Sequence, residues 1–416
     1  MSHNIEENTG FAGLGLLPKL LAVVARLGFT VPTPIQQAAI PVAVQGKDVI
    51  GVAQTGTGKT LAFALPLLQR LAAVKRLGLI ILPTRELAVQ VDEVLHQVGG
   101  PFGVRRALLI GGASLAVQVK QLRQRPHVVI GTPGRIIDHL EQKNLTLHAV
   151  GVLVLDEADR MLDMGFAPQI ARILQRVPRD RQTMLFSATM PPAIVKMAAQ
   201  YLRRPVRVEV ARTGTVAARV NQELFVIKHE HKVRLLHKLL GEYAGTVLVF
   251  SRTKYGAKKL CRTVRGMGHE AAEIHSNLTL AQRRRSLEGF KSGTYRVLVA
   301  TDIAARGIDV QNVALVINYD LPDHLEEYVH RVGRTGRAGR EGQAISFVTP
   351  EQRGKVRLLE RLVRTQLKVS PLPVLPADNW LTVPARRVRR ERARPHAVGR
   401  ATSQTARSSD RVRLHI

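Results

Sequence analysis

Cysteine is nearly absent from this sequence, and so are long apolar runs. Cys261 is the single cysteine among 416 residues, which excludes an intramolecular disulfide framework and a cysteine-rich zinc site. No uninterrupted apolar run reaches the roughly 18 residues of a membrane-spanning helix, and the polar N-terminal stretch MSHNIEENTG does not resemble a signal peptide. We therefore expect a cytoplasmic protein that makes no membrane contact.

Acidic and aromatic residues are also scarce. The chain has 32 acidic residues against 62 lysines and arginines, a formal net charge of +30, and only 4% aromatic residues. This excess of positive charge predicts a polyanionic partner; a generally basic proteome, in which charge serves solubility, is the alternative. Because Trp380 is the only tryptophan, base stacking on aromatic platforms is disfavoured. Contacts with a phosphate backbone, which carry little sequence information, are the favoured mode of binding.

Apolar content and periodicity predict two α/β domains. Hydrophobic residues make up 45% of the chain, enough for two cores, and short runs of Val, Ile and Leu alternate with helical patterns, as in parallel sheets covered on both faces. The pattern pauses near Gly214 and then restarts. After the second domain the composition becomes proline-rich and then arginine-rich, which is typical of a disordered segment. The predicted boundaries are a first domain at 1–209, a linker at 210–220, a second domain at 221–370 and a basic tail at 371–416.

The stretch AQTGTGKT at residues 53–60 nearly matches the spacing of a Walker A phosphate loop, with Ala53 in place of the usual first glycine. It lies between a predicted strand and a predicted helix. Gly56 and Gly58 would let backbone N–H groups face phosphate oxygens, while Lys59 would reach the β- and γ-phosphates and Thr60 would bind Mg²⁺. A glycine-rich turn before an ordinary helix is the alternative. The predicted nucleotide-binding residues of this loop are Thr55, Gly56, Thr57, Gly58, Lys59 and Thr60.

Three acidic residues close the stretch VLVLDEAD, at the end of an apolar strand. Asp156 ends the apolar run at the carboxyl edge of the predicted sheet, where it would hold Mg²⁺ partly through water. Glu157 would orient or deprotonate an attacking water. An acidic helix N-terminus would have the same composition, but the phosphate loop upstream favours a nucleotide site.

These two stretches belong to a series of motifs that resembles the DEAD-box RNA helicase family over roughly residues 11–370. The chain is most similar to the bacterial RhlE-type branch in three features: the sequence ATDIAARGIDV, the short N-terminus and the basic tail. Ser276 is a departure, because glycine often follows the equivalent of His275, and it leaves the local turn open. In family order, the matching stretches are Phe11 with GFTVPTPIQ (28–36), PTRELA (83–88), GG (111–112), TPGR (132–135), DEAD (156–159), SAT (187–189), VLVFSRT (247–253), Gln282 with Arg285, ATDIAARGIDV (300–310) and HRVGRTGR (330–337).

The resemblance implies two tandem RecA-like domains and assigns roles at the nucleotide. Gln36 would read the adenine edge and Phe11 would stack on the ring, which would make the enzyme selective for ATP. Asp309 would contact the ribose. The implied catalytic residues are Lys59, Asp156, Glu157, His330, Arg334 and Arg337, with the last two as arginine fingers and His330 in an interdomain network.

The resemblance also implies contacts with the RNA backbone from both domains. Taken alone, PTRELA would equally begin a helix with Thr84 as its cap, and TPGR would equally form a turn, so these roles depend on the whole series. Ser187, Thr189 and Asp159 would couple the Mg²⁺ site to the RNA-binding face. The implied RNA-binding residues are Arg85, Gly112, Thr132 and Arg135 in the first domain and Arg285 and Thr301 in the second.

The function implied is RNA-stimulated ATP hydrolysis, with Mg²⁺, coupled to local and non-processive separation of short RNA duplexes. A non-enzymatic RNA annealer and a DNA-directed motor of the same superfamily are the alternatives. Intact Glu157, Arg334 and Arg337 argue against the annealer, and Gln36 argues against the DNA motor. Ribosomal precursors and the RNA-decay machinery are both compatible partners. The tail is expected to tether RNA phosphates; a merely solubilising tail is the alternative.

Overall fold

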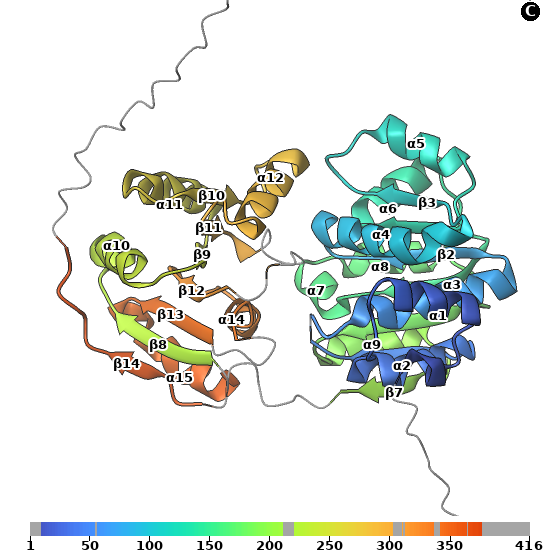
Figure 1. The fold of residues 1–416 in the computed structure, drawn as a ribbon, viewed down its shortest axis with the longest axis horizontal. Coiled ribbons are helices and arrows are strands. Elements are labelled where there is room, and N and C mark those ends of the chain that lie inside the picture. Colours follow the sequence, from blue (N-terminus) through green and yellow to red (C-terminus); the bar gives the residue numbers. More distant parts are fainter. Residues whose placement is uncertain are drawn as a thin grey trace, which may run out of the picture.

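The computed structural model describes residues 10–54, 56–210, 220–302, 310, 313–336, 342–363 and 365–376. Within these ranges the chain forms two parallel sheets of seven strands each, with helices covering the faces of each sheet (Figure 1). The predicted fold class, two α/β domains with parallel sheets, is confirmed. No helix in these ranges is both long enough and apolar enough to span a membrane.

The first domain has the strand order β3-β4-β2-β5-β6-β1-β7. Its strands are β1 (Val49–Val52), β2 (Leu77–Ile81), β3 (Arg106–Leu109), β4 (Val128–Gly131), β5 (Val150–Leu155), β6 (Gln182–Ser187) and β7 (Val206–Glu209). Its helices are η1 (Phe11–Leu14), α1 (Pro18–Arg26), α2 (Pro34–Val44), α3 (Lys59–Val74), α4 (Arg85–Gly99), η2 (Gly100–Phe102), α5 (Leu115–Arg123), α6 (Pro133–Glu141), α7 (Ala158–Asp163), α8 (Ala167–Leu174) and α9 (Pro192–Tyr201).

The second domain has the strand order β10-β11-β9-β12-β13-β8-β14. Its strands are β8 (Val220–Val226), β9 (Val247–Phe250), β10 (Ala271–Ile274), β11 (Val297–Ala300), β12 (Leu315–Asn318), β13 (Gly342–Val348) and β14 (Lys368–Ser370). Its helices are η4 (His229–His231), α10 (Lys232–Glu242), α11 (Lys254–Gly266), α12 (Leu280–Lys291), α14 (Glu326–Val332), η5 (Pro350–Gln352) and α15 (Arg353–Val363).

The strands of the first sheet send alternate side chains to two separate cores. Ile80 of β2 and Val154 of β5 lie in the core on one face, whereas Leu79 and Leu153, one residue earlier, lie in the core on the other face. Successive side chains of a strand point to opposite faces, so a strand buried on both faces is apolar at every position. This is why β2 and β5 appear in the sequence as continuous apolar runs.

Four strands are not predicted by the sequence pattern. Strand β7 lies in a stretch that resembles the start of a linker, and only Val208 of its four residues is buried. Strand β8 alternates buried and exposed positions over its first half, β13 begins at Gly342, and β14 has only three residues. Strands β7 and β14 lie at the sheet edges and are short, whereas the interior strands β8 and β13 contain polar residues in their first halves; in both cases the apolar run that identifies a central strand is lost.

Residues 371–376 correct the predicted start of the tail. Arg234 of α10 donates hydrogen bonds to the carbonyl oxygens of Pro376, at 2.7 Å, and Leu375, at 3.3 Å. The Leu375 side chain also packs against the core beside α10. These residues therefore belong to the surface of the second domain. The remainder of the predicted tail lies outside the described residues.

Cys261 offers a test of how well the second domain is packed. Its side chain lies on α11 within a core, and burial raises the pKa of the thiol to about 11. We predict that maleimide labels the native chain at neutral pH at least ~100-fold more slowly than the unfolded chain, because the thiolate is both scarce and covered. Mass spectrometry across a guanidinium titration would follow the labelling. Rapid stoichiometric labelling of the native protein would contradict this packing.

Candidate functional site

The phosphate loop lies between β1 and α3, as its sequence predicts. Gly56 and Gly58 adopt positive φ angles of 87° and 91°, a conformation that glycine tolerates and most other residues avoid. A Cβ atom at Gly58 would also lie 2.5 Å from the side-chain nitrogen of Gln36. The two glycines of GTGKT are therefore required by the shape of the loop. Thr57 closes it locally by donating from its hydroxyl to the carbonyl of Gln54 at 2.7 Å.

Lys59 begins α3 with a buried side chain that lacks a hydrogen-bond acceptor. The side chain is 5% exposed, and its ammonium nitrogen lies 3.9 Å from a carboxylate oxygen of Asp156. Among the described residues the nitrogen has no hydrogen-bond partner. A buried ammonium group without acceptors is costly, so this position suits an anionic ligand such as a phosphate. Thr60 follows in the first turn of α3 and is partly buried.

Asp156 and Glu157 occupy the end of β5, opposite the phosphate loop. Burial raises the pKa of Asp156 to about 6, although the nearby Lys59 ammonium acts in the other direction. Glu157 has a left-handed backbone with φ 52°, which is uncommon for a residue with a side chain. Its carboxylate accepts a hydrogen bond from the guanidinium of Arg160 at 2.9 Å. The two carboxylates thus have different partners and different environments.

Asp159 joins the DEAD stretch to the SAT stretch. One of its carboxylate oxygens accepts hydrogen bonds from the backbone N–H of Ala188 at 3.1 Å and from the backbone N–H and hydroxyl of Thr189 at 2.8 and 2.9 Å. The Ser187 hydroxyl accepts from the backbone N–H of Asp159 at 3.2 Å. The predicted coupling residues are therefore in direct contact, and the end of β6 cannot move independently of α7.

The second domain meets the DEAD stretch through α14. A small cavity there is lined by Arg160 of the first domain and by second-domain residues that include His330 and Arg334. Desolvation lowers the pKa of His330 to about 4, with the Arg160 guanidinium adding to the effect, so the ring is neutral at physiological pH. Arg334 is buried, with 3% of its surface exposed. The structure thus brings His330 and Arg334, two predicted second-domain residues, to the DEAD stretch of the first domain.

Arg331 has a structural role that the sequence reasoning missed. Its guanidinium forms two hydrogen bonds of 2.6 Å to the carboxylate of Asp302. It also donates to Asn318 and to the backbone carbonyl of Asp320, and it lies 4.9 Å from the ring centroid of Phe250. A buried bidentate pair fixes geometry well. Arg331 therefore holds α14 against β9, β11 and β12, and its position between His330 and Arg334 in the motif was the available signal.

The predicted adenine-reading residues lie close to the phosphate loop. The Gln36 side chain accepts a hydrogen bond from the N–H of Thr33 at 2.9 Å and donates to the carbonyl of Gly58 at 3.0 Å. Gln36 thus caps α2 and also contacts the loop. With the residues that the structure describes, its amide uses one N–H and one lone pair in these bonds, and an amide has one more of each for a ligand. Phe11 is 5% exposed and lies in the core, which leaves little ring surface for a base. Stacking by Phe11 stays a prediction.

The predicted RNA contacts of the first domain gather at the carboxyl ends of β2, β3 and β4. A Cβ atom at Gly112, where φ is 76°, would lie 2.5 Å from a guanidinium nitrogen of Arg85, so this arginine covers the GG turn. Arg135 donates to the carbonyl of Ala113 and pairs with Asp138. Thr132 caps α6 and donates from its backbone to β3. These residues therefore share one edge of the sheet.

In the second domain, an arginine that was not predicted makes the contact with the first. Arg285 is exposed on α12, and Thr301 is buried after β11. Arg283, two residues before Arg285, lies 3.1 Å from the carboxylate of Glu86 in α4, and both side chains are 8% exposed. Leu280, one turn earlier on α12, packs against the core of the first domain. The face of α12 that carries Leu280 and Arg283 is thus an interdomain surface.

Three predicted site residues lie outside the described residues. They are Thr55 in the phosphate loop, Asp309 as the ribose contact and Arg337 as the second arginine finger.

Comparisons with known proteins identify the family. A DEAD/DEAH box helicase family model matches residues 33–197, and a helicase conserved C-terminal domain model matches residues 231–339. The ATP-dependent rRNA helicase RRP3 of Scheffersomyces stipitis is 44% identical over 367 residues, which is 87% of this chain and 76% of that protein. The DEAD-box ATP-dependent RNA helicase CshA of Bacillus cereus is 44% identical over 370 residues, covering 88% of this chain and 70% of that protein.

A solved structure shares the two-domain arrangement. Dbp5 of S. cerevisiae, bound to RNA and ADP BeF3, superposes with a TM-score of 0.77 at 31% identity, covering 88% of this chain and 96% of the other. The fold and site thus define a two-domain, RecA-like nucleoside triphosphatase of the helicase type. The chain belongs to the DEAD-box family of ATP-dependent RNA helicases.

The Glu86–Arg283 pair predicts an effect on closure of the two domains. Removing one partner leaves the other charge buried, at a cost of about 3–5 kcal/mol, and this cost falls only on the state in which the domains touch. Glu86→Gln or Arg283→Gln should therefore raise the RNA concentration for half-maximal ATPase stimulation by about 100-fold or more. Steady-state ATPase titrations with RNA would measure this.

The double variant and a neighbouring control decide the interpretation. If the two residues act as one pair, Glu86→Gln/Arg283→Gln should be no worse than either single variant. Arg284→Gln should have little effect, because Arg284 is exposed and pairs with Glu288 within its own helix. Additive losses in the double variant, or an equal loss in the control, would contradict the interdomain role.

Proposed function

We propose that the junction of the two domains is an ATPase site that is complete only when both domains hold RNA. Lys59 binds the phosphates, and Glu157 positions or deprotonates the attacking water. Arg334 and Arg337 stabilise the charge that develops on the transferring phosphoryl group. Because the loop and the arginines belong to different domains, hydrolysis is fast only when the domains are in contact.

The observation that carries this proposal is the environment of His330. This second-domain ring is close enough to Arg160, Asp159 and Glu157 of the first domain for their charges to affect its pKa. It lies one turn before Arg334, on the element that Arg331 holds to the sheet. Any displacement of α14 away from the DEAD stretch would move Arg334 at the same time, so contact between the domains and placement of this arginine are one event.

RNA supports the closed state by touching both domains. Arg85, Thr132 and Arg135 offer a polar edge on the first domain, and Thr301 follows β11 in the second. A strand that contacts both edges binds the closed form better than the open form, and by linkage ATP then tightens RNA binding. A duplex that does not fit the closed path would be opened over a few base pairs, without processive movement. Asp159, through Thr189, connects this edge with the nucleotide.

The residues at the phosphate loop fit a bound Mg²⁺ ion. Asp156 has a buried carboxylate whose pKa is raised by desolvation, and a cation would stabilise its charged form. Thr60 provides a hydroxyl at the start of α3, as a phosphate loop requires. Thr60 and Asp156 would hold the ion, partly through water. When bound, Mg²⁺ neutralises charge on the phosphate oxygens.

Structured ribosomal RNA is the substrate that we favour. Relatives at 44% identity include a protein named as an rRNA helicase, and the chain carries a net charge of +30 with only 4% aromatic residues. Assembly precursors in the cytoplasm would suit such sequence-independent binding; RNA-decay complexes are the alternative.

The sequence ATDIAARGIDV supports placement of the chain in the bacterial RhlE-type branch. We place the domain boundaries at 1–209 and 220–376, with the linker between them and the basic tail after them.

Glu157→Gln tests the chemical step. The amide keeps the size of the side chain and an acceptor for Arg160 but is a poor base, so turnover with saturating RNA should fall about 10²- to 10⁴-fold while ATP and RNA still bind. Coupled-enzyme ATPase assays and nucleotide-binding titrations would separate the two effects. Glu141→Gln is the control, because Glu141 forms an exposed pair with Arg172 in the same domain. Near-normal turnover in Glu157→Gln would remove this residue from the mechanism.

The basic tail predicts a salt-dependent tether. Residues 380–416 carry ten arginines and two acidic residues. Replacing the ten arginines by glutamine keeps the length and should weaken RNA binding while kcat at saturating RNA stays near wild type. Each lost phosphate contact should flatten the plot of log K against log salt by about 0.7. Unchanged affinity and slope in fluorescence anisotropy would leave the tail a solubilising role only.

A further inference from the structure

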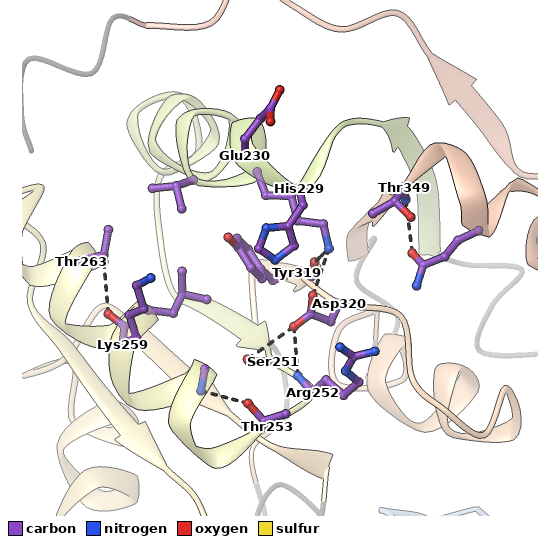
Figure 2. Close-up of a pocket in the computed structure, with 15 residues that line it drawn as sticks. His229, Glu230, Ser251, Arg252, Thr253, Lys259, Thr263, Tyr319, Asp320 and Thr349 are labelled. Carbon is purple, nitrogen blue, oxygen red and sulfur yellow. Dashed lines mark hydrogen bonds and ion pairs between the residues drawn. The ribbon is translucent and has the colours of Figure 1, made fainter.

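The second domain contains a cavity of about 560 Å³ at the carboxyl edge of its sheet (Figure 2). Ser251, Arg252 and Thr253 line it after β9, and Tyr319 and Asp320 line it after β12. In the strand order, the chain continues from β9 towards β10 on one side and from β12 towards β13 on the other. Such a divergence between neighbouring parallel strands opens a crevice, and ligands of open α/β sheets bind at this point.

The cavity corresponds to the phosphate site of the first domain. The two strand orders match position by position, with β8 in the place of β1 and β12 in the place of β5. Lys232 is the first residue of α10, as Lys59 is of α3. Its ammonium nitrogen lies 2.9 Å from a carboxylate oxygen of Asp320, and the equivalent Lys59–Asp156 distance is 3.9 Å.

Two differences make this cavity unsuitable for a nucleoside triphosphate. The segment before α10 is the 3₁₀ turn His229–His231, and it has no glycine to form a cradle of backbone N–H groups. Lys232 also donates to the carbonyl of Tyr319 at 2.7 Å and to Asp320, so it is satisfied internally, unlike Lys59. Burial works against the charge of Asp320, yet the Lys232 ammonium and the Arg252 N–H hold the pKa of this carboxyl below its usual value.

The remaining charge at the cavity is positive and faces outward. Arg252 and Lys259 line the opening, are exposed, and form no ion pair with any residue that the structure describes. In Figure 2 the carboxylate of Glu230 points away from the Asp320 cluster. Helix α11, which forms one wall, contains five basic residues and no acidic residue. Its exposed surface also carries Tyr255, at 71% exposure.

We propose that this cavity and the exposed face of α11 form a second RNA-binding surface, which holds the phosphate backbone of a strand outside the interdomain site. Arg252 and Lys259 would contact phosphates at the cavity, and Lys258 and Arg262 would continue the path along α11. Tyr255 offers a ring face for one base, whatever its identity. Helix α11 itself carries exposed cations and no acidic residue, and a row of exposed cations is the electrostatic footprint of a nucleic-acid backbone. The inference rests on the RNA-helicase function of the chain.

The test compares two RNAs of different length. The short RNA is the shortest strand that fully stimulates ATP hydrolysis, and the long RNA extends it with single-stranded nucleotides. Arg252→Gln/Lys259→Gln should weaken binding of the long RNA about 10-fold at 0.15 M salt and flatten its log K against log salt slope by about 1.4, for two lost contacts. Binding of the short RNA and ATPase turnover at saturating short RNA should stay at wild-type values.

A matched control removes the same charge elsewhere. Arg357→Gln/Arg361→Gln changes two exposed arginines of α15 and should leave binding of both RNAs near wild type. Equal losses for short and long RNA would place Arg252 and Lys259 in the interdomain site, and losses no larger than the control would mean that no RNA binds here; either result overturns the proposal. ATP is the other phosphate-bearing molecule that could occupy the cavity, and equilibrium dialysis would count the ATP molecules bound per chain. If the wild-type chain bound a second ATP that Arg252→Gln/Lys259→Gln did not bind, the assignment to RNA would be overturned. If the double variant Arg252→Gln/Lys259→Gln shows no cooperative unfolding transition, the comparison is repeated with Lys259→Gln alone.

Discussion

The arrangement of the two domains depends on the rule that a buried charge needs a partner. Glu86 and Arg283 are both buried, belong to different domains, and face each other at 3.1 Å. Separation of the domains would expose both side chains to water, whereas a contact that buried either of them without the other would leave a charge unpaired. The pair therefore restricts the domains to a small set of contact geometries. That restriction places α14, with His330 and Arg334, opposite the DEAD stretch.

The same α/β unit serves two different purposes in this chain. In the first domain, two glycines of the loop have positive φ, and Lys59 has no hydrogen-bond acceptor among the described residues, an arrangement that suits a phosphate. In the second, the equivalent lysine is occupied by Asp320 and Tyr319, and the equivalent loop has no glycine. The second domain instead places its other side, the end of α14, beside the DEAD stretch of the first.

Most of the fold could be predicted from the sequence, and so could the phosphate loop and the DEAD stretch of the first domain. Central strands are buried on both faces and appear as apolar runs, and GTGKT has local requirements that the backbone confirms. Edge strands such as β7 and β14 could not be predicted because they lack such runs. The Glu86–Arg283 contact could not be predicted for a different reason, because it joins residues almost 200 positions apart. In addition, nothing in the stretch RRR at 283–285 distinguishes the buried arginine from its exposed neighbours. Side-chain partners across domains depend on tertiary packing, which local periodicity does not encode.

The central claim is that RNA acts by bringing the two domains into the geometry described here. The most direct measurement is energy transfer between one dye on α5 and one on α15, in a Cys261→Ala chain, with ATP and RNA added separately and together. The account predicts a high-transfer state only when both are present, appearing at the same RNA concentration that stimulates ATP hydrolysis. Stimulated hydrolysis without a change in transfer, or full closure with ATP alone, would contradict it.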